Sequence, residues 1–204
     1  MSPLRAAYLV LANRGVSPTW LLWLLVGWAA AIVASRVAIP HVGPDVMVSA
    51  RALEQLGAIA VCIPVVLLAL LLTDSTPWMT NTSPRGNRVL RLTSFLLINS
   101  VGLSSAAIAA TLYPADVRWI RVVSLFWLAM SLTVLAGSLV DRVWAAVAGP
   151  LLVALATVRG LVPWEWNLVY NPETDAALVM TAVVAQLAAT CAANFPLDVR
   201  RNRE

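Results

Sequence analysis

Residues 73–92 read TDSTPWMTNTSPRGNRVLRL, and this polar stretch separates two strongly apolar runs of the chain. Its second half holds three arginines, Arg85, Arg88 and Arg91, spaced at i, i+3 and i+6. On a helix these side chains fall near one face and lead directly into the next apolar run. Two interpretations stay open. The stretch is a solvated connector whose arginines bind anionic lipid headgroups, or it is a docking site for another protein.

The composition predicts an integral membrane protein. Hydrophobic residues make up 60% of the 204 positions and charged residues only 12%, whereas soluble domains carry roughly 25% charge. The chain therefore has too few polar residues to cover a water-facing surface. In a bilayer every backbone polar group must be bonded within the protein, so spanning segments are helices or closed barrels. The apolar runs are about 20 residues long and do not alternate, which favours helices.

We therefore expect an all-α membrane protein with a single transmembrane domain over residues 1–204. Residues 1–18 are moderately apolar with basic flanks, which predicts a short amphipathic helix in the membrane surface. Breaker-rich or charged turns separate the apolar runs that follow. The expected transmembrane helices are 19–39, 52–72, 93–113, 119–140, 143–162 and 176–194.

A second unusual stretch lies between the fifth and sixth expected spans. Trp164, Trp166 and Tyr170 alternate there with polar or acidic residues. The stretch is too aromatic for a free loop and too short and polar to cross a bilayer. Tryptophan and tyrosine concentrate at membrane–water boundaries. Residues 163–175 are therefore predicted to form an interfacial or re-entrant element at the membrane surface.

The arginines predict the orientation. With the N-terminus inside, the inner segments carry the larger share, including Arg85, Arg88 and Arg91. The outer segments hold Arg36, Arg51, Arg118, Arg121 and Arg159. The positive-inside rule then places both termini in the cytoplasm. Arginine in place of lysine, with abundant alanine and valine, suggests a bacterial source and hence a bacterial plasma membrane.

Missing residue types limit the chemistry that the chain can perform. All 14 basic residues are arginine, so a Walker A lysine is absent and any ATP must be handled by another protein. His41 is the single histidine, which excludes a histidine pair on a metal. Neither a nucleophile–base pair nor paired carboxylates occur in the spans. We expect no catalytic site, no bound metal or cofactor, and no binding to nucleic acid.

A few polar side chains fall inside the expected spans. Asn99, Ser100 and Gln186 are costly in lipid unless they face another helix. They either join helices by hydrogen bonds or line a substrate path. Glu54 is the only carboxylate that could couple transport to an ion gradient, and it follows Arg51 at a spacing that favours a surface ion pair.

This order of helices and loops resembles the permease subunits of ABC-2-type ABC transporters, in particular the small, divergent actinobacterial ones. In that family the loop between the second and third spans holds a helix that seats in a groove of a separate ATPase. The resemblance implies that residues 73–92 form this coupling loop. It implies coupling roles for Asp74, Pro84, Arg85, Arg88 and Arg91.

The same resemblance implies the rest of the assembly. Residues 163–175 would form the extracellular cap, with Trp164, Trp166 and Tyr170. Six helices are too few for a full pathway, so a second copy or a homologous permease would pair with this one. ATP and magnesium would bind the ATPase subunit, and the cargo would be hydrophobic, amphipathic or a peptide. The alternatives are a non-transporting accessory or scaffold subunit and a small secondary carrier.

Overall fold

The described residues of the computed structural model are all helical or in turns. They are residues 18–36, 57–72, 86–114, 117–139, 142–157, 161–163, 166–169 and 171–194. Within them lie six α-helices and one 3-10 helix. Their bounds are α2 Pro18–Ala34, α4 Cys62–Leu72, α6 Gly86–Ala110, α7 Trp119–Leu139, α8 Arg142–Thr157, η2 Pro172–Thr174 and α9 Asp175–Asn194. The amphipathic helix expected at residues 1–18 lies almost entirely outside the described residues.

Local sequence explains where the helices begin and end. Proline at the first position of α2 has no N–H to lose and a φ angle already suited to a helix. The apolar run after it continues to residue 39, but α2 ends at Ala34. The Ser35 hydroxyl donates to the Ile32 carbonyl at 2.7 Å, and the Arg36 N–H donates to Val33 at 3.0 Å. These i to i−3 bonds tighten and close the last turn.

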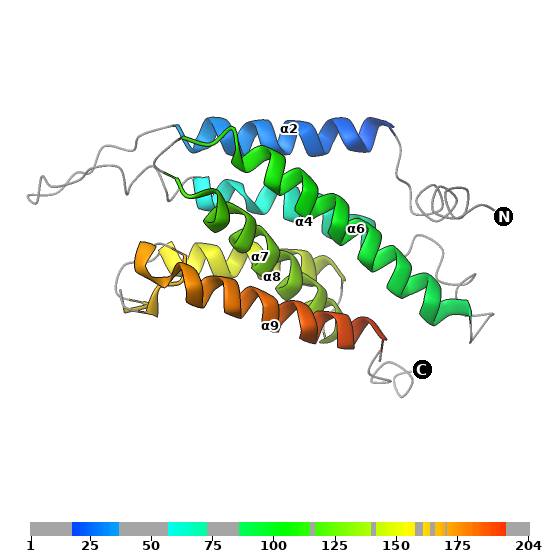
Figure 1. The fold of residues 1–204 in the computed structure, drawn as a ribbon. Helices are drawn as coiled ribbons and strands as arrows, with labels where there is room; N and C mark the ends of the chain where they lie inside the picture. Colours follow the sequence, from blue (N-terminus) through cyan, green and yellow to red (C-terminus); the bar gives the residue numbers. More distant parts are fainter. Residues whose placement is uncertain are drawn as a thin grey trace, which may run out of the picture.

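Consecutive helices alternate in direction along the bundle (Figure 1). Helix α7 is central, because it packs against α6, α8 and α9 and also touches α4. Helix α2 lies at the edge and packs mainly on α4. One end of the bundle holds the C-terminal ends of α2, α6 and α8 and the N-terminal ends of α7 and α9. The other end holds the start of α6 and the end of α9.

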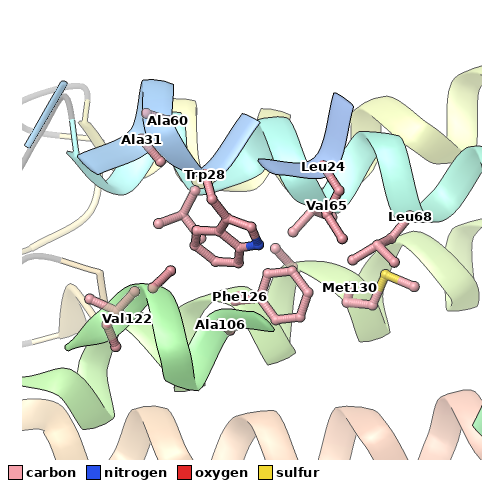
Figure 2. Packing of buried hydrophobic residues seen from close by; sticks show 14 of the residues in the cluster. Leu24, Trp28, Ala31, Ala60, Val65, Leu68, Ala106, Val122, Phe126 and Met130 are labelled. Carbon is pink, nitrogen blue, oxygen red and sulfur yellow. The ribbon is translucent and has the colours of Figure 1, made fainter. Parts of the chain in front are cut away.

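The main core lies between α2, α4, α6 and α7, where Trp28 and Phe126 face each other (Figure 2). Their ring centroids are 5.5 Å apart, with the planes tilted by 40°. The indole N–H of Trp28 donates to the Ser105 hydroxyl at 3.0 Å, so its polar atom is satisfied within the core. A Cβ at Gly102 would lie 2.9 Å from the Phe126 ring. Glycine thus leaves the space that the ring fills.

Two helices are long and apolar enough to cross a membrane by length and composition. They are Trp119–Gly137 of α7, half of which is buried in the bundle, and Asp175–Ala192 of α9, of which 17% is buried. The other apolar helices of the described residues have 10 to 17 residues. The prediction of an all-helical protein is therefore confirmed. The prediction of six spans is supported for two helices and is not supported for the other four.

Helices α7 and α8 approach each other closely at Gly149, which precedes Pro150 within α8. A Cβ at Gly149 would lie 2.7 Å from the carbonyl oxygen of Ala129 and 3.0 Å from the hydroxyl of Thr133. A backbone oxygen cannot turn away as a side chain can. A Cβ at Gly137, on the partner helix α7, would meet only Ala145 at 3.6 Å. The two glycines thus differ in what surrounds them.

We predict that Gly149→Ala lowers the free energy of unfolding by about 1–3 kcal/mol, because the added methyl group forces α7 and α8 apart. Gly137→Ala leaves it unchanged or raises it by up to about 1 kcal/mol, because alanine is the better helix former. Unfolding of both variants in detergent, followed by circular dichroism, measures the difference. Equal effects of the two substitutions would contradict the close contact at Gly149.

Candidate functional site

The described residues between α8 and α9 lie at one end of the bundle (Figure 1). We call these residues, 161–163, 166–169 and 171–174, the strap. Asn167 fixes its middle, because its amide group donates to the Ala156 carbonyl of α8 at 3.0 Å. The amide oxygen of Asn167 accepts from the Val169 N–H at 3.2 Å. Its backbone carbonyl accepts from Asn171 at 3.0 Å. One asparagine thus folds the strap and ties it to α8.

Asn171 organises the second half of the strap and the start of α9. Its side-chain oxygen accepts from the Glu173 N–H at 3.0 Å, which caps η2. The Thr174 hydroxyl donates to the Asn171 carbonyl at 2.7 Å. Because η2 continues directly into α9 at Asp175, these bonds fix where the carboxylate of Asp175 lies.

Two arginines at the N-terminal end of α7 converge on this carboxylate: Arg118 immediately precedes the helix and Arg121 lies in its first turn. Arg118 donates to Asp175 Oδ2 at 2.7 Å, and Arg121 Nε lies 3.7 Å from Asp175 Oδ1. Arg121 also donates to the Asn171 carbonyl through Nη2. The Arg118 side chain is 68% exposed, whereas those of Arg121 and Asp175 are 10% and 14% exposed. The Asp175 charge also lies at the N-terminus of α9, where the helix dipole stabilises an anion.

The inner face of the strap is apolar. Val169 is buried in a cluster with Ala58, Cys62, Leu125 and Val153, which come from the α4 region, α7 and α8. Leu168 packs against a second cluster formed by α7 and α9, whose buried members are Leu128, Leu178 and Ala182. The strap therefore covers two small apolar clusters at this end of the bundle and is separate from the main core.

The aromatic residues that the sequence singled out here are only partly described. Trp166 is in the strap and is strongly exposed, as is Trp119 at the start of α7. Leu161 is exposed too. This end of the molecule thus presents large apolar side chains beside arginine. Trp164 and Tyr170 lie outside the described residues.

Of the expected coupling residues, the two that the structure describes lie toward the opposite end of the bundle (Figure 1). Asp74, Pro84 and Arg85 are outside the described residues. Arg88 and Arg91 are in the first two turns of α6, which begins at Gly86. Only the backbone of these two arginines is described. Helix α6 has 25 residues and is therefore about 37 Å long at 1.5 Å per residue, longer than a hydrocarbon core of about 30 Å.

The polar residues expected inside the spans occupy different environments. Asn99 is only 5% exposed, and its side-chain oxygen has no hydrogen-bond partner among the described residues. Ser100, the next residue of α6, is exposed. Gln186 of α9 accepts a hydrogen bond at 2.7 Å from the hydroxyl of Ser131 on α7. Gln186 thus lies at a helix–helix contact, whereas Asn99 is buried without a partner for its acceptor. Glu54 is outside the described residues.

Sequence reasoning did not identify the polar network at the strap. Arg118 and Arg121 were used only as charges that indicate the orientation. Asn167, Asn171 and Asp175 were not predicted to be functional residues. Two signals were available. The arginines are spaced at i and i+3 at the start of an apolar helix, and the asparagines are four residues apart just before the next helix.

Within the described part of the chain, no group of three or more His, Cys, Asp or Glu side chains is arranged to hold a metal ion. A scan against protein-family models, a search of curated proteins and a search of solved structures each returned no match. The resemblance to ABC-2-type permeases therefore stays a prediction.

We predict that Asn99→Leu keeps or raises the free energy of unfolding, because it removes a buried acceptor that has no partner. Gln186→Leu should lower it by about 0.6 kcal/mol, the average measured for hydrogen bonds between membrane helices, and by no more than about 1.7 kcal/mol. Thermal unfolding of the two variants in one detergent compares them directly. If Asn99→Leu proves the more destabilising change, Asn99 has a structural partner outside the described residues.

Proposed function

We propose that the chain is a multi-pass membrane protein that acts as the permease subunit of an ABC-2-type ABC transporter. The observation that carries this proposal is the arrangement of the helices. Six described helices alternate in direction, an ordered strap lies between the last two, and a basic helical extension lies at the other end. This is the order of parts that the resemblance implies. The cargo would be hydrophobic, amphipathic or a peptide, and both termini would be cytoplasmic.

Exposed apolar surface supports the membrane location. On α9 the side chains of Met180, Val184 and Leu187 are each more than 60% exposed. Helix α2 exposes Trp23 and Leu25 to a similar degree. Contiguous apolar surface of this kind is rare on soluble monomers and marks contact with lipid or another protein. With lipid around it, the same surface needs no polar cover.

The start of α6 supports the coupling role. Its first two turns contain Arg88 and Arg91 and precede the apolar part of the helix, Phe95–Ala110. A rigid helix that continues from the basic segment into the bundle can transmit a displacement from one end to the other. ATP hydrolysis would be supplied by a separate ATPase, because the chain has no lysine for a phosphate-binding loop.

A second subunit is part of the proposal. A pathway through the membrane would form between two permease subunits, either two copies of this chain or this chain and a homologue. Alternating closure of that interface would move the cargo. The exposed faces of α2 and α9 are the apolar surfaces available for contact with lipid or with the second subunit.

We predict that Val184→Arg, in the middle of the exposed face of α9, removes most of the protein from the membrane fraction. An arginine at the centre of a spanning helix costs about 2.5–3.5 kcal/mol for insertion. Leu161→Arg in the strap serves as the control, because arginine is tolerated near the headgroups. The amount of protein left in alkaline-washed membranes is measured. If Val184→Arg retains its level and becomes soluble without detergent, α9 faces water and the membrane location is wrong.

We predict that the double variant Arg85→Glu/Arg88→Glu loses co-purification with an ATPase encoded beside this chain, because the reversed charges oppose docking. Arg36→Glu makes the same change on an exposed arginine at the strap end and should leave the association intact. If both variants co-purify equally, residues 73–92 are not the docking site. If the wild-type chain purifies as a stable monomer without an ATPase, the scaffold and carrier alternatives replace the permease.

A further inference from the structure

The two arginines at the strap make different kinds of contact with the same carboxylate. Arg118 has the shorter distance to Asp175, 2.7 Å, but its side chain is 68% exposed. Exposed ion pairs contribute little, because water screens the charges and two long side chains must be held in place. Arg121 lies 3.7 Å from the same carboxylate but is 10% exposed. Removing Arg121 would leave the exposed Arg118 as the remaining charged partner of Asp175 among the described residues, and the loss of a buried partner costs more than the loss of an exposed one.

Arg121 also reaches a part of the strap that Arg118 does not. Its guanidinium group donates to the carbonyl of Asn171, the residue that caps η2. Arg121 therefore contacts both the strap and the start of α9. Arg118, which immediately precedes α7, bonds to Asp175 among the described residues, and this bond is exposed.

Among the described residues, other contacts also attach the strap to the bundle. Val169 is buried in the cluster with Cys62, Leu125 and Val153, Leu168 packs on the second small cluster, and Asn167 bonds to Ala156. The main core around Trp28 and Phe126 contains no strap residue. A segment that lies outside the main core can open at a lower free energy than that core.

We propose that the strap is a latched cover and that Arg121 is its latch. When Arg121 releases Asn171 and Asp175, the strap leaves the end of the bundle while the main core stays packed. The opening exposes the apolar surface of α4, α7 and α8 that Val169 covers. This inference is independent of the permease proposal, because it rests on contacts within the chain alone.

Cys62 provides a reporter of the opening. It is buried in the cluster beneath Val169, and Cys191, the only other cysteine, is exposed. Changing Cys191 to alanine leaves Cys62 as the single thiol. The experiment measures the rate at which a charged, water-soluble maleimide labels Cys62 in the purified full-length chain in detergent. When the strap opens and closes faster than the thiol reacts, this rate follows the open fraction.

We expect Arg121→Met to raise the labelling rate of Cys62 by about tenfold or more, the factor that follows from losing a hydrogen bond to a charged group. Arg118→Met makes the same change one turn away and should alter the rate by about threefold or less, since its ion pair is exposed. Arg121→Lys keeps the charge and should restore part of the protection.

A second reporter separates local opening from unfolding. Val65 is one turn from Cys62 on α4 and is fully buried in the main core. In a chain with Cys62→Ala, Cys191→Ala and Val65→Cys, Arg121→Met should leave the labelling rate within about twofold, because that core lies outside the locally opening segment.

Two results would overturn the proposal. If Arg121→Met speeds labelling at both positions equally, Arg121 stabilises the whole fold and the strap is not a separate cover. If Arg121→Met and Arg118→Met have the same effect on Cys62, the buried contact has no special role. A chain with Arg121→Met that fails to fold gives the first result and counts against the latch.

Discussion

The fit of Phe126 against Gly102 is the contact on which the arrangement of the helices depends. Because Gly102 has no side chain, the ring of α7 can lie against the backbone of α6, and Leu68 of α4 lies beside the same position. Trp28 of α2 then packs on the ring. One side chain thus joins four helices. In the membrane location that we propose, burial from water supplies no driving force between helices, and close packing of this kind would hold them together.

The polar contacts around this apolar centre are placed according to the free energy that it costs to bury each kind of group. Inside the bundle, the described contacts of Trp28 with Ser105 and of Ser131 with Gln186 join neutral groups. The ion pairs of the described residues lie at the strap end, where Arg118 and Arg121 meet Asp175. A charge is much less costly near the boundary of a bilayer than at its centre. The same constraint that packs the middle with apolar residues therefore places the charged contacts at an end.

The sequence was most informative where one local rule decides the outcome. The apolar runs located the helices because a helix satisfies its own backbone, and the bounds of α7 and α9 follow those runs closely. The end of α2 could not be read in this way, since it depends on the bonds of Ser35 and Arg36 after Ala34. The strap network was missed for a similar reason. Arg121 is far in sequence from Asn171 and Asp175, and the packing of α7 against α9 brings it to them.

One local conflict in the sequence does indicate this network. Arg118 immediately precedes α7 and Arg121 is its third residue, where the positive end of the helix dipole disfavours a cation. Nothing acidic stands in the first turn of α7 to compensate. Natural sequences generally avoid such local conflicts unless tertiary contacts outweigh them. Asp175 supplies that contact, and its own position at the start of α9 is favourable for an anion. Arginines at the wrong end of a helix can therefore be taken as a sign of a partner elsewhere in the chain.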